Sequence, residues 1–353
     1  MARCDRIWRV LSLLSLVGWS LLCGGSQTTC AAQGDSLFPV RVNYDDEAWV
    51  EIPPAEAVRL VDEALAKQPK YGSGRVRVLV YLNAQGESDR DTVIQLFGEL
   101  KSTDAPAKLR EKMAPLRRDV PKDITQKLNW SEVTITEDGD SVIEKSEKWS
   151  SQTWSSTYLS TDKIKIVYEG AQQQADVALP GLQNRMAVHR LASFHVPLHP
   201  VKEQSVLSAA KTPDFVKLVR GSQGGPSRTT IFSVRDGSVL HENLTSSDGT
   251  LTKETWQGPM KEWAGGVRYP TSLLQFRYMD GAVMDVEAVA VQQAEFNVRV
   301  EPSEFVVAIP AGTTVVDVRE GEPAVVRVKQ PIDDLVAALD AGLPTKVRPT
   351  KVD

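Results

Sequence analysis

The sequence FVVAIPAGTTVVD spans residues 305–317 and interrupts a β-like run with a proline and a glycine. Residues 305–309 are largely apolar and suited to a strand, but Pro310 has no backbone N–H with which to continue strand pairing. Gly312 can adopt the positive φ of a tight turn, and residues 313–316 favour a strand again. The stretch therefore predicts two strand segments separated by a turn.

Residues 1–32 have the pattern of an export signal. Three arginines precede the apolar run 10–22, which is too short to span a bilayer, and small residues favour cleavage after Ala32. We therefore expect a protein of the bacterial periplasm, or a secreted one. A lipid anchor at Cys23 is the alternative, which the bulky Leu22 disfavours.

Cleavage after Ala32 would remove all three cysteines of the 353-residue chain and change its formal net charge from −5 to −7. The mature protein would then contain no disulfide, so it must rely on its apolar core. A net negative charge argues against nucleic acid as a partner. No second apolar run reaches the length of about 18 residues that a transmembrane helix needs.

Four segments of the N-terminal half differ in pattern. Residues 33–54 form an acidic lead-in that we expect to be mobile, and residues 55–67 have the spacing of an amphipathic helix. In RVRVLVYL, residues 75–82, polar and apolar residues alternate, which is typical of a strand with one solvent-exposed and one buried face. Residues 91–128 predict a helical insert of short amphipathic helices.

The remainder is rich in β-formers. Asp-Gly pairs at 138–139, 236–237, 248–249 and 280–281 favour type I′ turns, so each predicts a hairpin. Residues 182–210 have helical spacing broken by prolines.

Residues 321–353 form a C-terminal extension. Within it, PIDDLVAAL predicts a short helix stopped by Gly342. The repeated PTKV sequence that follows is typical of a disordered tail.

The stretch AEFNVRVEPSEFVVAIPAGTTVVDVR, residues 294–319, resembles the C-terminal signature of the LolA-like family of periplasmic lipoprotein carriers. The matching positions are Phe305, Pro310, Gly312, Val315, Asp317 and Arg319. Residues 269–298 look like the hairpin and strand that precede the signature in outer-membrane lipoprotein-sorting proteins. The helix at 55–67 and the strand after it are similar to the opening of the family.

The resemblance implies an α+β fold over residues 55–320, in which a curved antiparallel sheet forms an incomplete barrel and amphipathic helices cover its concave face. It implies a non-enzymatic carrier or sensor that binds a lipid, a lipoprotein acyl chain or another apolar ligand, with neither catalytic residues nor a cofactor. Each methylene that leaves water contributes about 0.8 kcal/mol, so an apolar trough under a movable lid can hold an acyl chain.

Apolar residues on the predicted strands are the candidates to line that cavity, and three helical residues are the candidate lid. The strand residues are Val76, Val78, Val80, Ile164, Ile166, Phe232, Leu274, Phe276, Tyr278, Met284 and Val286, and the lid residues are Leu60, Val61 and Leu65. Periodicity does not distinguish a packed face from an empty one. The alternative is therefore a filled core in an envelope scaffold protein that recruits protein partners.

The sequence HRLASFHVPLHP raises a third hypothesis, a metal-dependent enzyme. It contains His189, His195 and His199, and zinc can bind three imidazoles. However, no HExxH motif accompanies them, and two prolines favour a loop. We therefore predict no metal site.

Overall fold

The computed structural model describes residues 35–68, 70–88, 90–113, 131–138, 141–148, 155–180 and 196–343. The chain divides into a unit of residues 1–35 and a unit of residues 36–353, and every element below belongs to the second unit. The predicted signal peptide, the insert after Met113 and the tail after Leu343 lie outside the described residues, as do His189 and His195.

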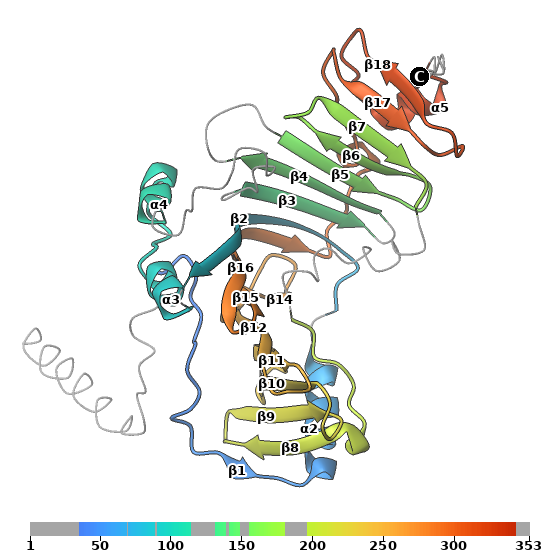
Figure 1. Cartoon of the computed structure of the whole chain (residues 1–353). Coiled ribbons are helices and arrows are strands. Elements are labelled where there is room, and N and C mark those ends of the chain that lie inside the picture. Colours follow the sequence, from blue (N-terminus) through green and yellow to red (C-terminus); the bar gives the residue numbers. More distant parts are fainter. Residues whose placement is uncertain are drawn as a thin grey trace, which may run out of the picture. The chain divides into compact units, whose positions relative to one another are not determined.

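Sixteen of the described strands form one sheet (Figure 1). In sheet order they are β1 (Val50–Glu51), β8 (Val206–Lys211), β9 (Phe215–Gly221), β10 (Ser227–Ser233), β11 (Val239–Thr245), β12 (Leu251–Gln257), β15 (Ser272–Met279), β16 (Ala282–Phe296), β2 (Ser73–Ser88), β3 (Ser131–Asp138), β4 (Ser141–Lys148), β5 (Ser155–Ser160), β6 (Lys165–Glu169), β7 (Gln174–Ala178), β17 (Thr314–Asp317) and β18 (Ala324–Arg327). Neighbouring strands are antiparallel except β7 and β17, which are parallel. Among the described strands β1 and β18 are the two ends of the sheet, so the barrel is not closed.

Helices are few in the described part of the chain. They are α2 (Pro54–Lys67), α3 (Arg90–Gly98), α4 (Pro106–Lys112) and α5 (Leu335–Asp340), with 3-10 turns η3 (Glu203–Ser205) and η4 (Pro302–Glu304) and a separate hairpin of β13 (Met260–Glu262) and β14 (Arg268–Pro270). The helix predicted at 55–67 is confirmed as α2, α3 begins one residue before the predicted insert 91–128, and α4 lies within it. The short helix of the C-terminal extension is confirmed as α5. The protein is therefore mostly β.

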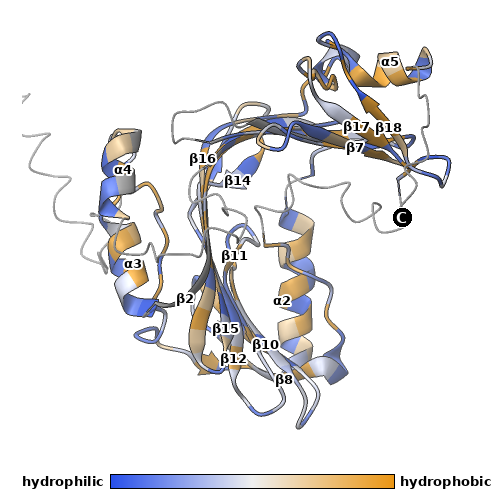
Figure 2. Cartoon of the chain, turned by 45° about the horizontal axis from the view of Figure 1, so that its top comes forward, coloured by the Kyte–Doolittle hydropathy of each residue, from blue (hydrophilic) through white to orange (hydrophobic). Residues whose placement is uncertain are grey.

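The two faces of the sheet are covered by different elements. Directly paired residues of antiparallel strands share a face, so the register assigns each side chain. We call the face that carries Val78 face A and the face that carries Leu79 face B. Helix α2 packs on face A over β8–β11, whereas α3 and α4 pack on face B over β2, β12, β15 and β16. Figure 2 shows α2 and α3 on opposite sides of the sheet, so the helices do not all cover one face as expected.

The signature that opened the sequence analysis is only partly strand. Residues 305–308 form no strand, and Ile309 makes an isolated bridge to Ile332. Gly312 has a φ of +88°, which confirms the predicted turn, and pairing resumes at β17. Thr313 is fully buried and donates a hydrogen bond from its hydroxyl to the carbonyl of Pro310 at 2.8 Å. The motif turns the chain into the parallel position beside β7.

Three other expectations differ from the structure. The lead-in is packed rather than mobile, because Tyr44 and Ile52 are buried and β1 pairs with β8. The described end of the segment 182–210 contains η3 and β8 rather than a helix. Strand β2 places Arg75 and Arg77 on the solvent-exposed part of face B, but its residues 79 and 81 on the same face are buried under α3. The expected alternation of exposed and buried side chains therefore fails there.

The hairpin predictions hold in the described residues. Asp280 and Gly281 have φ angles of +51° and +81°, the pair of positive angles that a type I′ turn needs, and they connect β15 to β16. Gly237 connects β10 to β11 and Gly249 connects β11 to β12, each with a positive φ, but Asp236 and Asp248 have no positive φ, so these two hairpins form without the expected type I′ turn. Asp138 ends β3, whose partner is β4.

Candidate functional site

A band of branched apolar side chains crosses face A on three neighbouring strands. Val76 pairs with Ile135, Val78 with Val133, and Val80 with Val289. All six are at most 5% exposed. Their described neighbours include Tyr269 of β14, Phe296 of β16 and Val196, which packs against them partly buried. We call these six residues the apolar band.

Helix α2 lies on the same face at the other end of the sheet. Its buried residues Ala57, Val61 and Ala64 belong to one cluster with Val216, Leu218 and Phe232 of β9 and β10. Gly237 allows close contact here, because a Cβ atom at this position would lie 2.2 Å from the carbonyl oxygen of Ala64. The helix is therefore seated tightly on β8–β11.

The register divides the predicted cavity residues between the two faces. Face A carries Val76, Val78, Val80 and Phe232, and Leu60, Val61 and Leu65 of α2 pack against that face. Face B carries Ile166, Leu274, Phe276, Tyr278 and Val286. Ile164 precedes β6 and joins the cluster of Ile166, while Met284 is half-buried beside an irregularity of β16. The structure does not bring these residues together on one surface, and their role in ligand binding stays a prediction.

Sequence reasoning missed the partners of the β2 valines. Val133 and Ile135 alternate with Thr134 and Thr136 in SEVTITED, a strand pattern that could have identified them. Val289 lies within a run that is apolar at most positions, so periodicity gives no signal for its face.

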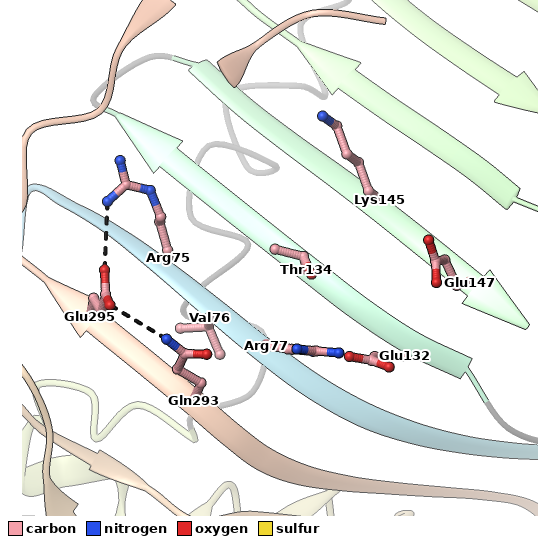
Figure 3. A pocket seen from close by; sticks show the side chains of 9 residues that line it. All are labelled: Arg75, Val76, Arg77, Glu132, Thr134, Lys145, Glu147, Gln293 and Glu295. Carbon is pink, nitrogen blue, oxygen red and sulfur yellow. Dashed lines mark hydrogen bonds and ion pairs between the residues drawn. The ribbon is translucent and has the colours of Figure 1, made fainter. Parts of the chain in front are cut away.

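A depression of about 410 Å³ lies on the exposed part of face B, between β16, β2, β3 and β4. Figure 3 shows the side chains that line it. Its charges are largely paired with one another. Arg75 contacts Glu295 and donates hydrogen bonds to Glu304, and Arg77 forms an ion pair with Glu132. The hydrogen bonds from Arg75 lower the pKa of Glu304 to about 2. Both arginines already have carboxylate partners, which leaves Lys145 as the one lining cation without an ion pair among the described residues, so the depression is a weak candidate for a charged ligand.

A buried polar network lies elsewhere on face B, under α3. The carboxylate of Glu254 accepts hydrogen bonds from Arg90 Nε at 2.8 Å and from the Tyr278 hydroxyl at 2.9 Å, and His241 Nε2 lies 3.2 Å away. Burial opposes ionisation of Glu254, but these partners outweigh it and lower its pKa. His241 also stacks on Trp256, over which the Arg90 guanidinium lies at 4.9 Å. The Glu254 carboxylate therefore joins Arg90 of α3 to side chains of β11 and β15, and the network fastens α3 to the sheet.

A second depression, of about 600 Å³, opens on face A. It is lined by the cations Arg220 of β9 and Arg228 of β10 and by His199, the one predicted histidine among the described residues. Burial and the two arginines lower the pKa of His199. No group of three potential metal ligands occurs among the described residues. This depression therefore presents cationic side chains rather than a set of metal ligands.

No helix in the described ranges combines the length and the apolar character that crossing a bilayer requires. No protein-family model and no curated protein matches the sequence.

The chain is similar to three solved structures. One is a LolA superfamily protein from Nitrosomonas europaea, with 12% identity, 70% of this chain and 94% of that chain covered, and a TM-score of 0.37. Another is a putative outer membrane lipoprotein-sorting protein domain from Vibrio parahaemolyticus, with 9% identity, coverage of 71% and 97%, and a TM-score of 0.37. The third is a DUF1329 family protein from Desulfovibrio piger, with 8% identity, coverage of 72% and 98%, and a TM-score of 0.40.

Proposed function

We propose that the protein is a non-enzymatic carrier or sensor that binds the acyl chain of a lipid or lipoprotein on face A. The observation that carries the proposal is the apolar band, six branched side chains on three adjacent strands of an open sheet. The sequence resemblance to periplasmic lipoprotein carriers supports the same function.

The chemistry of such a carrier is burial rather than bond making. An acyl chain gains about 0.8 kcal/mol for each methylene group that it removes from water, so burial of many methylene groups against the band is needed to hold it. Release needs a second conformation in which the protein groups that pack against the apolar band move away from it. The ligand shifts the equilibrium between the two conformations. The predicted export signal supports action in the periplasm, where a soluble carrier would shield the chain between membranes.

One observation favours a second candidate, an envelope scaffold protein with a filled core. Val78, Ile135 and Val289 have no exposed surface, as expected of side chains that pack against other protein groups. In that case the band contributes stability, and partners bind elsewhere. The two functions make opposite predictions for a larger side chain in the band.

Replacing Val80 with phenylalanine distinguishes them. Val80 is 5% exposed, at the end of the band. In a carrier, the ring of Val80→Phe occupies space used by the ligand, whereas in a filled core it forces overpacking that costs about 1–3 kcal/mol. Val325→Phe is the matched control, because Val325 is 53% exposed on β18.

Native mass spectrometry of the full chain, purified without detergent, gives the first readout, and urea unfolding gives the second. The carrier hypothesis predicts that the wild type and Val325→Phe carry an additional mass of the size of a lipid, and that Val80→Phe does not. It also predicts that the unfolding free energy of Val80→Phe differs little from that of the wild type. A bare wild-type mass together with destabilised Val80→Phe would support the scaffold and reject the carrier.

A further inference from the structure

Two arginines lie directly opposite each other on face A. Arg220 of β9 is the register partner of Arg228 of β10. Side chains at directly opposite positions have Cβ atoms about 5 Å apart, and like charges in such a pair destabilise a sheet. A fold that places two guanidinium groups together in this way needs a compensating negative charge.

The described residues supply that charge only in part. Arg228 lies 3.5 Å from the carboxylate of Glu242, which is 7% exposed. Arg220 forms no ion pair with the described residues, and its Nε is buried without a hydrogen-bond partner among them. Burial is the main cause that lowers the pKa of Arg220, and Arg228 adds to it. Lys253 on β12 is a further cation near Glu242. The site therefore holds more positive than negative charge.

The surroundings suit a small, compact ligand. The depression of about 600 Å³ is lined beside the arginines by His199 and by hydroxyl-bearing residues that include Ser205, Ser227 and Thr252. The Ser227 and Thr245 hydroxyls share a hydrogen bond of 2.7 Å. Guanidinium groups bind tetrahedral oxyanions through paired N–H donors, and such charge-assisted bonds are about twice as strong as neutral ones.

We propose that Arg220 and Arg228, with His199 at the rim, form a binding site for a phosphate group, either free or on a lipid headgroup. Arg220, Arg228 and Lys253 carry three positive charges against the one negative charge of Glu242, so the remaining charge matches a dianionic phosphate. The site does not depend on the apolar band, so it stands if the carrier hypothesis fails.

Isothermal titration calorimetry of the full chain with inorganic phosphate tests the site, with sodium chloride adjusted to hold ionic strength constant. We expect Arg220→Gln and Arg228→Gln each to weaken binding about tenfold or more, because each removes a charged donor pair. Arg220→Lys should give an intermediate loss, because it keeps the charge without the planar fork. Arg299→Gln is the matched control for charge, since its side chain is 87% exposed, and it should bind as the wild type does.

Flotation with vesicles distinguishes the two sources of phosphate. Binding to vesicles that contain phosphatidic acid, whose headgroup is a phosphomonoester, competed by inorganic phosphate and absent with phosphatidylcholine alone, assigns the site to a lipid headgroup. Phosphate binding without vesicle binding assigns it to a free oxyanion. Circular dichroism confirms that each variant is folded. The proposal is overturned if folded wild-type protein binds neither probe, or if both arginine-to-glutamine variants bind as the wild type does.

Discussion

Arginines occur in two contrasting environments on opposite faces of the same sheet. On face B, Arg90 donates to Glu254, which also accepts from Tyr278 and lies beside His241. On face A, Arg220 faces Arg228, and its Nε has no partner among the described residues. The first arrangement satisfies its charges within the protein. The second does not.

The difference teaches how charge is used in this fold. A buried charge that has lost water must be paired, and the Glu254 network achieves this with three neighbouring side chains. Arg220 and Arg228 have one carboxylate between them, so their pairing needs a group from outside. We infer that the Glu254 network fastens α3 to face B and that these two arginines of face A offer their charge to a ligand.

Removing the buried carboxylate of Glu254 on face B should have the largest effect on stability. Glu254→Gln removes the buried counter-charge of Arg90 and leaves this guanidinium only the exposed carboxylate of Asp91 among the described residues, and we expect it to lower the free energy of unfolding by about 3 kcal/mol. Urea denaturation measures the change. The control is Glu63→Gln, which breaks the exposed pair with Arg59 and should cost less than about 1 kcal/mol. Equal effects of the two substitutions would show that the network is not a structural anchor.

The close packing of α2 on face A can be tested by substituting two glycines, one that contacts the helix and one that does not. Gly237→Ala must place a Cβ atom against the Ala64 carbonyl at a φ of +71°, so we expect a loss of about 2–3 kcal/mol. Gly249→Ala is strained by its φ of +85° but has open space, so about 1 kcal/mol is expected. Thermal unfolding compares them, and an equal loss would mean that α2 adapts easily.

A smaller effect on the free energy of unfolding is expected from breaking the ion pair between Glu304 and Arg75, which lines the polar depression of face B. The pKa of Glu304 is lowered to about 2, so its ion pair with Arg75 stabilises the fold above the ordinary carboxyl pKa and is lost as pH falls from about 4.5 towards 2. Both groups are partly exposed, so Glu304→Gln should cost less than about 1 kcal/mol at pH 7. The difference from wild type should shrink at pH 2.5. A difference that is constant with pH would exclude this pairing as its cause.

Local sequence patterns predicted the helices and hairpins of the fold better than they predicted on which face of the sheet each side chain lies. The spacing of Val61 and Leu65 identified α2, and Asp-Gly pairs identified hairpins, because these signals depend on neighbours in the chain. Leu274 and Phe276 were grouped with Val76 and Val78, yet the register places them on opposite faces. Bulges and irregularities, such as that between Val291 and Gln293, shift the alternation, and no local pattern reveals them.

The candidate sites were harder still to predict, since they depend on residues far apart in sequence. Glu254 and Arg90 are 164 positions apart, and an isolated glutamate in a strand indicates a solvent-facing residue. Arg220 and Arg228 are the two ends of RGSQGGPSR, residues 220–228, a glycine-rich stretch typical of a turn. Placing them opposite each other requires the register of β9 and β10. The helical expectation for 182–210 also failed in its described end, where β8 pairs with β9.

The most direct test of the contrast between the two faces is the unfolding free energy of Arg90→Gln and Arg220→Gln, measured in urea without phosphate. Arg90→Gln should lose about 2 kcal/mol, because Glu254 keeps its burial but loses its cation. Arg220→Gln should be neutral or gain about 0.5 kcal/mol, because it relieves the repulsion from Arg228. A loss in Arg220→Gln as large as that in Arg90→Gln would show that both arginines serve the structure, and would contradict the account.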